Sequence, residues 1–445
     1  MFCLMKHNID NEKNLRISLS NGVLASVMSG LTSDFFVPFL LFLGATASQI
    51  GLLNGLPNLA AAFVQLKSAT LTKVLNGRKR VILFSICGQL LVLSVLVAAA
   101  WCRCVSIETL IGVVILFTCF GALAAPAWGS LLSEFVDHNE RGRYFGYRNR
   151  VLGFVQVGSG VGAGLLLYAS PHNGAGIGFA VLFCIAFCAR LFSLLFALKI
   201  SEPAVHESLS DFFTFSDFIK RFKKSNFTKF VFLVSGMSFC VNIVSPFFSV
   251  LMLKGLGFDY LTYTVLMFSS TIMIFGWQKR WGIFADTVGN VKVLRLTSLL
   301  IAVLPALWLI SRHPLYLFII QMFAGFVWAG YNISSSNFIY DAVSPAKRVR
   351  CISYFNVING VSLCAGSLLG AFLVSRVPPL MGNKILFLCV VSSIARFAAA
   401  FFGFSHIQEV RQVKDISSYE LFVSAVGIKA VPGVQRKLLR FSDPV

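Results

Sequence analysis

The chain has 445 residues, of which 57% are hydrophobic and 13% charged, and its net charge is +20. A soluble domain contains about 25% charged residues, so this composition excludes an ordinary water-soluble protein. The basic residues lie in short segments between long apolar runs. That pattern argues against nucleic acid as a partner and indicates a membrane protein.

Apolar runs of about 20 residues follow one another along the chain, each long enough to cross a bilayer as an α-helix. We place twelve of them, in chain order, near 19–43, 49–71, 81–101, 107–133, 145–169, 176–198, 229–253, 261–278, 291–311, 314–340, 351–375 and 383–405. The sequence therefore predicts an all-α integral membrane protein with twelve transmembrane helices.

The chain contains an internal repeat with a spacing of about 207 residues. In each copy an acid ends an apolar run, a short basic loop follows, and a glycine-rich apolar run comes next. Glu134 aligns with Asp341, and Arg141 of the first basic loop aligns with Arg348. Duplicated halves in a hydrophobic chain are typical of secondary transporters. We expect a cytoplasmic N-terminus (1–18), a first six-helix bundle (19–198), a central loop (199–228), a second bundle (229–405) and an amphipathic tail (406–445).

Lysine and arginine predict the topology. With the N-terminus inside, 31 of the 38 Lys and Arg residues fall on the cytoplasmic side and five in outer loops, while Arg190 and Arg396 lie within helices. The positive-inside rule then places both termini in the cytoplasm. The short outer loops favour a bacterial inner membrane. Aromatic and basic residues in the central loop and tail predict contact with membrane lipids; a regulatory partner is the alternative.

The segment Gly282-Ile-Phe-Ala-Asp-Thr-Val-Gly-Asn-Val-Lys292 is similar to the loop signature G-x-x-x-D-x-x-G-[RK]-[RK] of the major facilitator superfamily. Together with the six-plus-six plan, it makes the chain from about Ser18 to Ser405 resemble that superfamily. The first-half loop keeps only Asn76-Gly-Arg-Lys-Arg80 and has Val74 at the aspartate position. The resemblance implies two pseudo-symmetric six-helix bundles that transport by alternating access around a central cavity lined by helices one, four, seven and ten.

Carboxylates beside Lys and Arg in such loops can pair when the inner gate is shut and separate when it opens. We expect an inner latch made of the loop residues and the ends of helices four and ten: Gly282, Asp286, Gly289, Lys292, Glu134, Arg141, Asp341 and Arg348. The alternative is that these acids only cap helix ends or balance local basic charge.

Asp34 lies deep in the first apolar run, and the stretch from Asp34 to Pro38 aligns with the stretch from Asn242 to Pro246 on helix seven. A carboxylate there costs about 2.5–3.5 kcal/mol or more, so it must face a cavity or a partner. The resemblance implies that Asp34 and Asn242 face each other across the central cavity. Asp34 is then either a proton carrier or cation ligand, or a fixed structural acid.

Aromatic, amide and hydroxyl side chains within the spans are further candidates for solute binding: Trp128, Trp328, Tyr331, Asn332, Ser335, Asn356 and Asn359. Hydrogen bonding between helices is the alternative for each of them. Arg190 and Arg396 are either structural or bind an anion. Glycines four apart, such as Gly366 and Gly370, predict a seam where helices of the two halves meet, and a lipid-facing stripe for homodimer contact is the alternative.

The predicted function is secondary active transport or facilitated passage of a small organic solute, with or without proton coupling through Asp34. A non-transporting membrane scaffold or sensor is the alternative. The sequence has no P-loop, HExxH or GxSxG motif and no Cys/His set with metal-ligand spacing, so we predict no enzyme, cofactor or metal site. We expect a monomer.

Overall fold

The computed structural model describes residues 2–102, 105–136, 141–170, 175–202, 225–343, 345–403 and 407–410. For residues 2–11, 69, 133, 141–143, 175 and 345–350 the description covers the backbone alone. The described chain is helical almost throughout, which confirms the all-α prediction. It forms two compact units, Met1–Ser208 with Ser249–Thr264, and Leu209–Phe248 with Val265–Val445.

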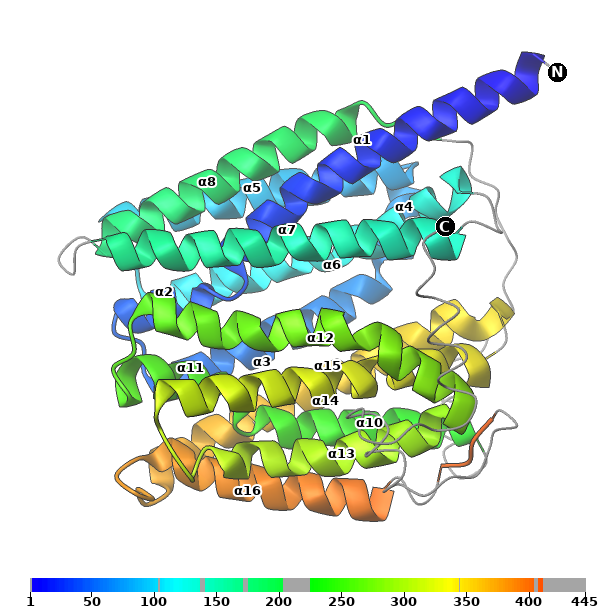
Figure 1. Ribbon diagram of the computed structural model, residues 1–445. Coiled ribbons are helices and arrows are strands. Elements are labelled where there is room, and N and C mark those ends of the chain that lie inside the picture. Colours follow the sequence, from blue (N-terminus) through cyan, green and yellow to red (C-terminus); the bar gives the residue numbers. More distant parts are fainter. Residues whose placement is uncertain are drawn as a thin grey trace. The chain divides into compact units, whose positions relative to one another are not determined.

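The first unit holds the helices of the N-terminal half (Figure 1). They are α1 (Phe2–Thr32), α2 (Phe36–Phe42), α3 (Ala47–Leu66), α4 (Ser68–Val74), α5 (Arg78–Cys102), α6 (Ile107–Phe135), α7 (Arg141–Ala169) and α8 (Ala175–Leu198). Within this unit α1 packs against α7 and α8, α5 against α6 and α8, and α3 against α6.

The remaining helices repeat this plan in the second half of the chain. They are α10 (Asn226–Asn242), η2 (Ser245–Phe247), α11 (Phe248–Val250), η3 (Leu251–Gly255), α12 (Tyr260–Val288), α13 (Asn290–Leu307), α14 (Pro314–Ala342), α15 (Pro345–Arg376), α16 (Lys384–Ala398) and η4 (Ala399–Gly403). Within the second unit α10 packs against α15, and α13 packs against α14 and α16.

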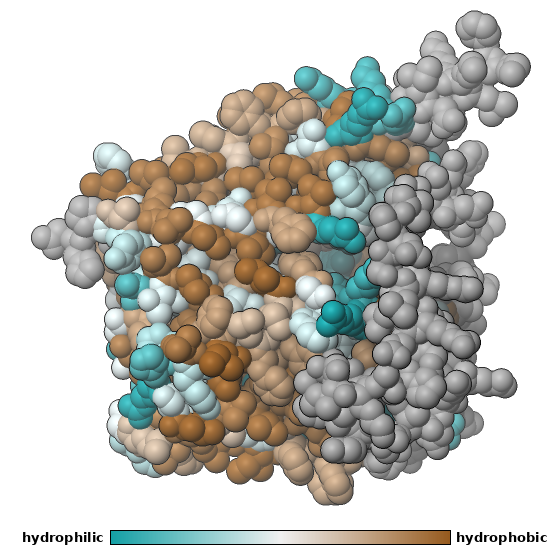
Figure 2. All heavy atoms as spheres, viewed as in Figure 1, coloured by the Kyte–Doolittle hydropathy of each residue, from teal (hydrophilic) through white to brown (hydrophobic). Residues whose placement is uncertain are grey.

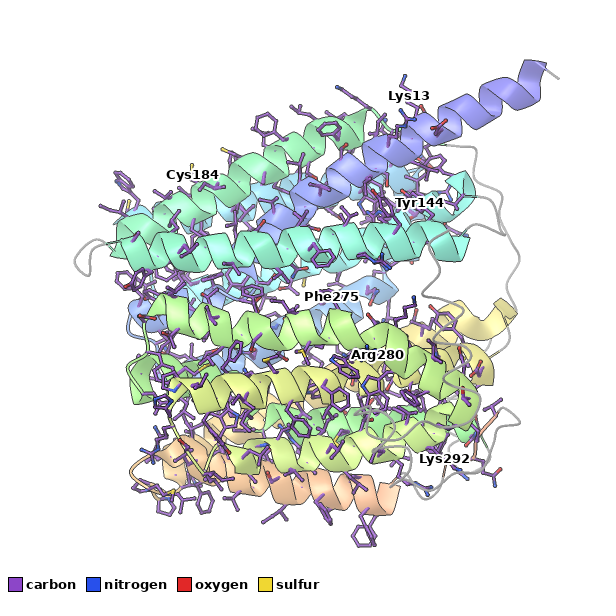
Figure 3. The ribbon with its side chains drawn as sticks, in the orientation of Figure 1. Lys13, Tyr144, Cys184, Phe275, Arg280 and Lys292 are labelled. Atoms are coloured by element: carbon purple, nitrogen blue, oxygen red, sulfur yellow. The ribbon has the colours of Figure 1, made fainter. Side chains whose placement is uncertain are left out.

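Eleven helical segments of the described chain are long and apolar enough to cross a membrane. The helix at the remaining predicted position is α3, which is 20 residues long but carries Asn54, Asn58 and Gln65, and these amides lower its hydropathy. Large apolar side chains such as Leu91 and Ile394 are more than 60% exposed, as expected for a surface that contacts lipid. Figure 2 shows the apolar side chains covering the length of the helices on one face. Cys184 on α8 and Phe275 on α12 are two further exposed residues (Figure 3).

Both halves interrupt their first long helix, which the sequence analysis did not predict. The first break covers residues 33–35, between α1 and α2, and the second covers residues 243–244, between α10 and η2. Proline has no N–H to donate to the carbonyl four residues earlier. Pro38 therefore leaves the carbonyl of Asp34 without its helical partner, and Pro246 does the same at Asn242.

Each unit has its own apolar core. In the second unit the core centres on Trp281, whose indole ring is 1% exposed and packs against Phe326, with ring centroids 5.2 Å apart. The indole nitrogen donates to the Phe326 carbonyl at 2.9 Å, so this buried polar group is satisfied. In the first unit a smaller cluster joins α5, α6 and α8 around Ile86, Leu131 and Ala197.

Two glycines of α15 pack against α10 and the break that follows it, within their own unit. A Cβ on Gly366 would meet the Phe239 carbonyl of α10, and a Cβ on Gly370 would meet the Ile243 carbonyl. Both contacts lie within the second unit, so the seam between the halves stays a prediction for these two residues. In the first unit Gly30 gives α1 the same close approach to Gln156 of α7.

Candidate functional site

The break between α1 and α2 is held by a hydroxyl from another part of the first unit. Tyr263, at the start of α12, is 2% exposed, and its hydroxyl donates to the Asp34 carbonyl at 3.1 Å. It also lies 3.2 Å from the Ser249 hydroxyl. Tyr263 thus supplies the hydrogen bond that Pro38 cannot make. Nearby, the Lys254 ammonium donates to the Ala45 carbonyl beyond the end of α2 at 2.8 Å.

The Asp34 side chain itself stands apart from these bonds. It is half-buried, and its carboxylate has no hydrogen-bond or ion-pair partner among the residues that the structure describes. A carboxylate left unpaired within a membrane span is a common mark of a functional site.

Asn242 ends α10 at the matching break in the second unit. Its amide donates to the Ser238 carbonyl one turn back, at 2.9 Å. Two carbonyls next to the break accept from α16: Ser392 donates to Cys240 at 2.7 Å and Arg396 donates to Val241 at 3.2 Å. Arg396 also bonds the Ile301 carbonyl of α13 at 3.1 Å, so its guanidinium joins three helices.

Arg190 occupies the matching place on α8 but has different partners. One of its terminal nitrogens donates to the Gln89 amide oxygen of α5, and the other donates to Ser193 at 3.3 Å. Asn21 of α1 donates to the Ser193 carbonyl at 2.7 Å. These contacts tie α1, α5 and α8 together. Among described residues, the side-chain hydrogen bonds of Arg190 and Arg396 go to neutral groups, and the Arg190 Nε is left without a partner.

At the start of α5, two acids surround a buried arginine. Arg78 has a side chain that is 6% exposed and pairs with Glu134 of α6, with one guanidinium nitrogen 2.9 Å from a carboxylate oxygen. Glu202, beyond the end of α8, accepts from the Arg78 backbone N–H at 2.7 Å and from the Lys79 N–H at 3.1 Å. Glu202 therefore caps the N-terminus of α5, where a carboxylate is favoured.

The start of α13 has a related arrangement. Gly289 forms the turn with φ of +97°, a conformation that glycine adopts readily. Asn290 donates to the Asp341 carboxylate at 2.8 Å, and Glu409 accepts from the Val291 backbone N–H, also at 2.8 Å. Glu202 follows α8, the last long helix of the first half, and caps α5. In the same way Glu409 follows the last described helix of the second half and caps α13.

The predicted loop before Gly289 is largely helical. Gly282 and Asp286 lie in the last turns of α12, and the turn before α13 is Gly289 alone. The helix continues because its buried side, which includes Trp281 and Phe284, packs into the core of the second unit. Asp286 is exposed, and Lys292 is half-buried in the first turn of α13 (Figure 3). The side chains of Arg141 and Arg348 lie outside the described residues.

The predicted solute-binding residues differ in burial and in their contacts. On α14, Trp328 and Tyr331 touch edge to face with centroids 5.4 Å apart, and Tyr331 is buried in the core. Asn332 is exposed, whereas the Ser335 hydroxyl is buried. Three more are half-buried: Trp128 on α6, and Asn356 and Asn359 on α15. Among the described residues, the hydroxyls of Tyr331 and Ser335 and the Asn359 amide oxygen have no hydrogen-bond partner.

Comparison with known proteins identifies the family. Residues 20–280 match the model of the Major Facilitator Superfamily. The chain belongs to this superfamily. No curated protein sequence matches it.

Solved structures of superfamily type share its fold. A point mutant of the nucleoside transporter NupG is 14% identical with a TM-score of 0.70, covering 88% of this chain and all of that one. A bacterial homologue of the human lysosomal transporter Spinster is 12% identical with a TM-score of 0.68, covering 95% of this chain and 99% of that chain. A D-xylose–proton symporter is 12% identical with a TM-score of 0.67, and the match covers 92% of this chain and 99% of that chain. At these identities the likeness concerns the fold.

Membership of the superfamily makes this chain a multi-pass membrane protein and a secondary transporter of a small-molecule solute. Among the described residues no group of three or more His, Cys, Asp or Glu side chains is placed to hold a metal ion. Sequence reasoning did not find Tyr263, Glu202 or Glu409. Each acts on backbone groups far away in the chain, so no local pattern marks it.

Proposed function

We propose that this superfamily member moves a small organic solute by alternating access and that Asp34 couples the movement to a proton or another cation. The observation that carries the proposal is the Asp34 carboxylate, which lies unpartnered among described residues at the break between α1 and α2. An unpaired carboxylate at membrane depth is costly unless it is neutralised by a proton or a cation. Such neutralisation can be coupled to movement of the helix that carries it.

The break is suited to that movement. The chain at residues 33–35 is not restrained by a continuous helical ladder, and the Tyr263 hydroxyl holds the released carbonyl. Hydrogen bonds from side chains to the backbone carbonyls at a helix break can be lost without disturbing the rest of the helix. We infer that Tyr263 and Lys254 release α2 in one conformation and hold it in another.

The clusters at the starts of α5 and α13 serve in this proposal as cytoplasmic latches. In the first, the Arg78–Glu134 pair joins α5 to α6, and Glu202 joins the segment after α8 to α5. In the second, Asp341 of α14 accepts from Asn290 at the start of α13, and Glu409 accepts from the Val291 backbone N–H. Ion pairs that exchange partners between two conformations can set their relative populations. Asp286, Lys292, Arg141 and Arg348 remain proposed members of these latches.

The excess of Lys and Arg in alternate loops supports a topology with both termini in the cytoplasm. We propose a bacterial inner membrane as the location, contact of the central loop and tail with membrane lipids, and a monomer as the working form. We propose transport without any catalytic step. The expected placement of Asn242 opposite Asp34 in a central cavity, and solute contacts from Trp328, Asn332 and Ser335, also stay proposals.

Solute uptake into proteoliposomes, with and without an inward proton gradient, tests the coupling role. Asp34→Asn should remove the stimulation by the gradient while keeping exchange of solute across the membrane. Asp259→Asn is a matched control, because Asp259 is an exposed acid that caps the start of α12 and asparagine caps equally well. Equal stimulation by the gradient in wild type and Asp34→Asn would contradict the proposal.

A further inference from the structure

A cavity of about 450 Å³ lies within the first unit, next to the break between α1 and α2. Its walls come from the start of α2 with Phe36, from α3 with Asn54 and Asn58, from α5 with Gln89, and from α6 with Phe117 and Thr118. The volume suits a small-molecule ligand of monosaccharide or nucleoside size. None of the described side chains that line it is charged.

The polar atoms that the cavity offers include both hydrogen-bond acceptors and donors, because each asparagine amide donates only one of its two N–H groups to the described part of the chain. One amide N–H of Asn54 donates to the Ile50 carbonyl at 3.2 Å, and one amide N–H of Asn58 donates to the Asn54 carbonyl at 2.8 Å. Thr118 donates its hydroxyl to the Val114 carbonyl at 2.9 Å. The amide oxygens of both asparagines are left without a partner among the described residues. A ligand that satisfies these oxygens must supply O–H or N–H groups.

Behind the cavity wall lies a positive charge. Gln89 accepts from buried Arg190 and donates to the Phe117 carbonyl at 3.3 Å, so both ends of this amide are fixed. Gly121 leaves room for it, since a Cβ there would stand 3.2 Å from the Gln89 amide nitrogen. The Arg190 charge disfavours a cation in the cavity. No described side chain of the lining carries a charge that could offset the desolvation of an anion.

We propose that this cavity binds an uncharged solute rich in O–H or N–H donors, held by the amide oxygens of Asn54 and Asn58 and packed against Phe36 and Phe117. These two rings meet edge to face with centroids 5.5 Å apart and present an apolar wall to the carbon skeleton of the solute. The inference rests on the proposed transport function, because it names the class of solute that the chain carries.

Binding to the purified full-length protein in nanodiscs, measured by calorimetry, tests the proposal with parent solutes and charged analogues. The uncharged probes are glucose and uridine. The charged analogues are glucosamine, glucuronate and uridine monophosphate, which keep the same rings. We expect at least one uncharged probe to bind, and its charged analogues to bind at least roughly tenfold more weakly. Binding of neither uncharged probe, or tighter binding of a charged analogue, would overturn the proposal.

Two variants locate the binding in this cavity. Ala122→Phe fills the space without removing a polar group and should abolish binding. Asn58→Asp keeps the side-chain shape but adds a negative charge, so it should raise the relative affinity for glucosamine roughly tenfold. Asn149→Asp on exposed α7 is the matched control and should leave the preference unchanged. An unchanged preference in Asn58→Asp would refute the assignment even if Ala122→Phe fails to fold.

Flux measurements on the same preparations separate this inference from the proposed function. Transport of a charged analogue without transport of its uncharged parent would leave the transporter proposal intact and reject the solute class. Binding of the parent in the cavity without any flux would support the site and contradict the transport proposal.

Discussion

The hydrogen bond from Tyr263 to the break in the first long helix gives a direct prediction. Tyr263→Phe removes one oxygen from a fully buried side chain and keeps its ring in place. The Asp34 carbonyl then loses its partner at 3.1 Å, and Pro38 cannot replace it. The variant should loosen α2 and the segment Ser249–Thr264 while leaving the remainder of the first unit intact.

The size of the effect follows from the unsatisfied carbonyl. Leaving a buried acceptor unpaired costs about 1–3 kcal/mol, which corresponds to a roughly 5- to 150-fold larger population of the opened break. The Ser249 hydroxyl, 3.2 Å from the Tyr263 hydroxyl, is left without this partner as well, so we expect a value above the low end of that range.

Hydrogen–deuterium exchange of the protein in nanodiscs measures this population. Backbone amides of α2 should exchange faster in Tyr263→Phe by the same factor, whereas those of α8 should keep their wild-type rates. Tyr168→Phe is the control, because the Tyr168 side chain is 57% exposed on α7. Unchanged exchange of α2 in Tyr263→Phe would refute the view that this hydroxyl holds the break.

Three further substitutions test the other contacts. Glu134→Gln should lower thermal stability in detergent by only about 1–2 kcal/mol, because Arg78 keeps Glu202 and Glu134 is 37% exposed; no loss would mean that the pair is not formed. Glu409→Ala should cost about 0.5–2 kcal/mol and speed amide exchange at Val291. Arg396→Met leaves the Ile301 carbonyl of α13 without a donor among described residues, because Pro305 has no N–H, and removes one of the donors to the Val241 carbonyl at the break after α10. It should cost more than about 2 kcal/mol, and a smaller effect than that of Glu134→Gln would contradict its structural role.

The hydropathy pattern predicts most of the architecture. Apolar runs longer than about 20 residues leave helices as the available structure in a bilayer, and the repeat of Glu134 at Asp341 indicates two halves. Helix boundaries were less predictable. The chain around Asp286 is polar enough to resemble a loop, yet it stays helical because the opposite side of the same turns packs into the core.

The parts of the site that were not predicted depend on contacts between distant residues. Pro38 and Pro246 are visible in the sequence, but which group would replace the lost hydrogen bonds is not. Tyr263 lies 229 residues from Asp34, and Glu202 lies 124 residues from Arg78. Pairings of this kind arise from packing of whole helices, and periodicity within one helix carries no signal of them.

The central claim is that the Asp34 carboxylate couples solute binding to a proton or another cation. The most direct test is the ligand-dependent thermal stabilisation of purified wild type and Asp34→Asn at about pH 5.5 and about pH 7.5, since a ligand that binds the folded state raises its apparent stability. Our account predicts that the stabilisation differs between the two pH values in wild type and is the same at both in Asp34→Asn. An identical pH dependence in the two proteins would contradict it and leave Asp34 as a structural acid.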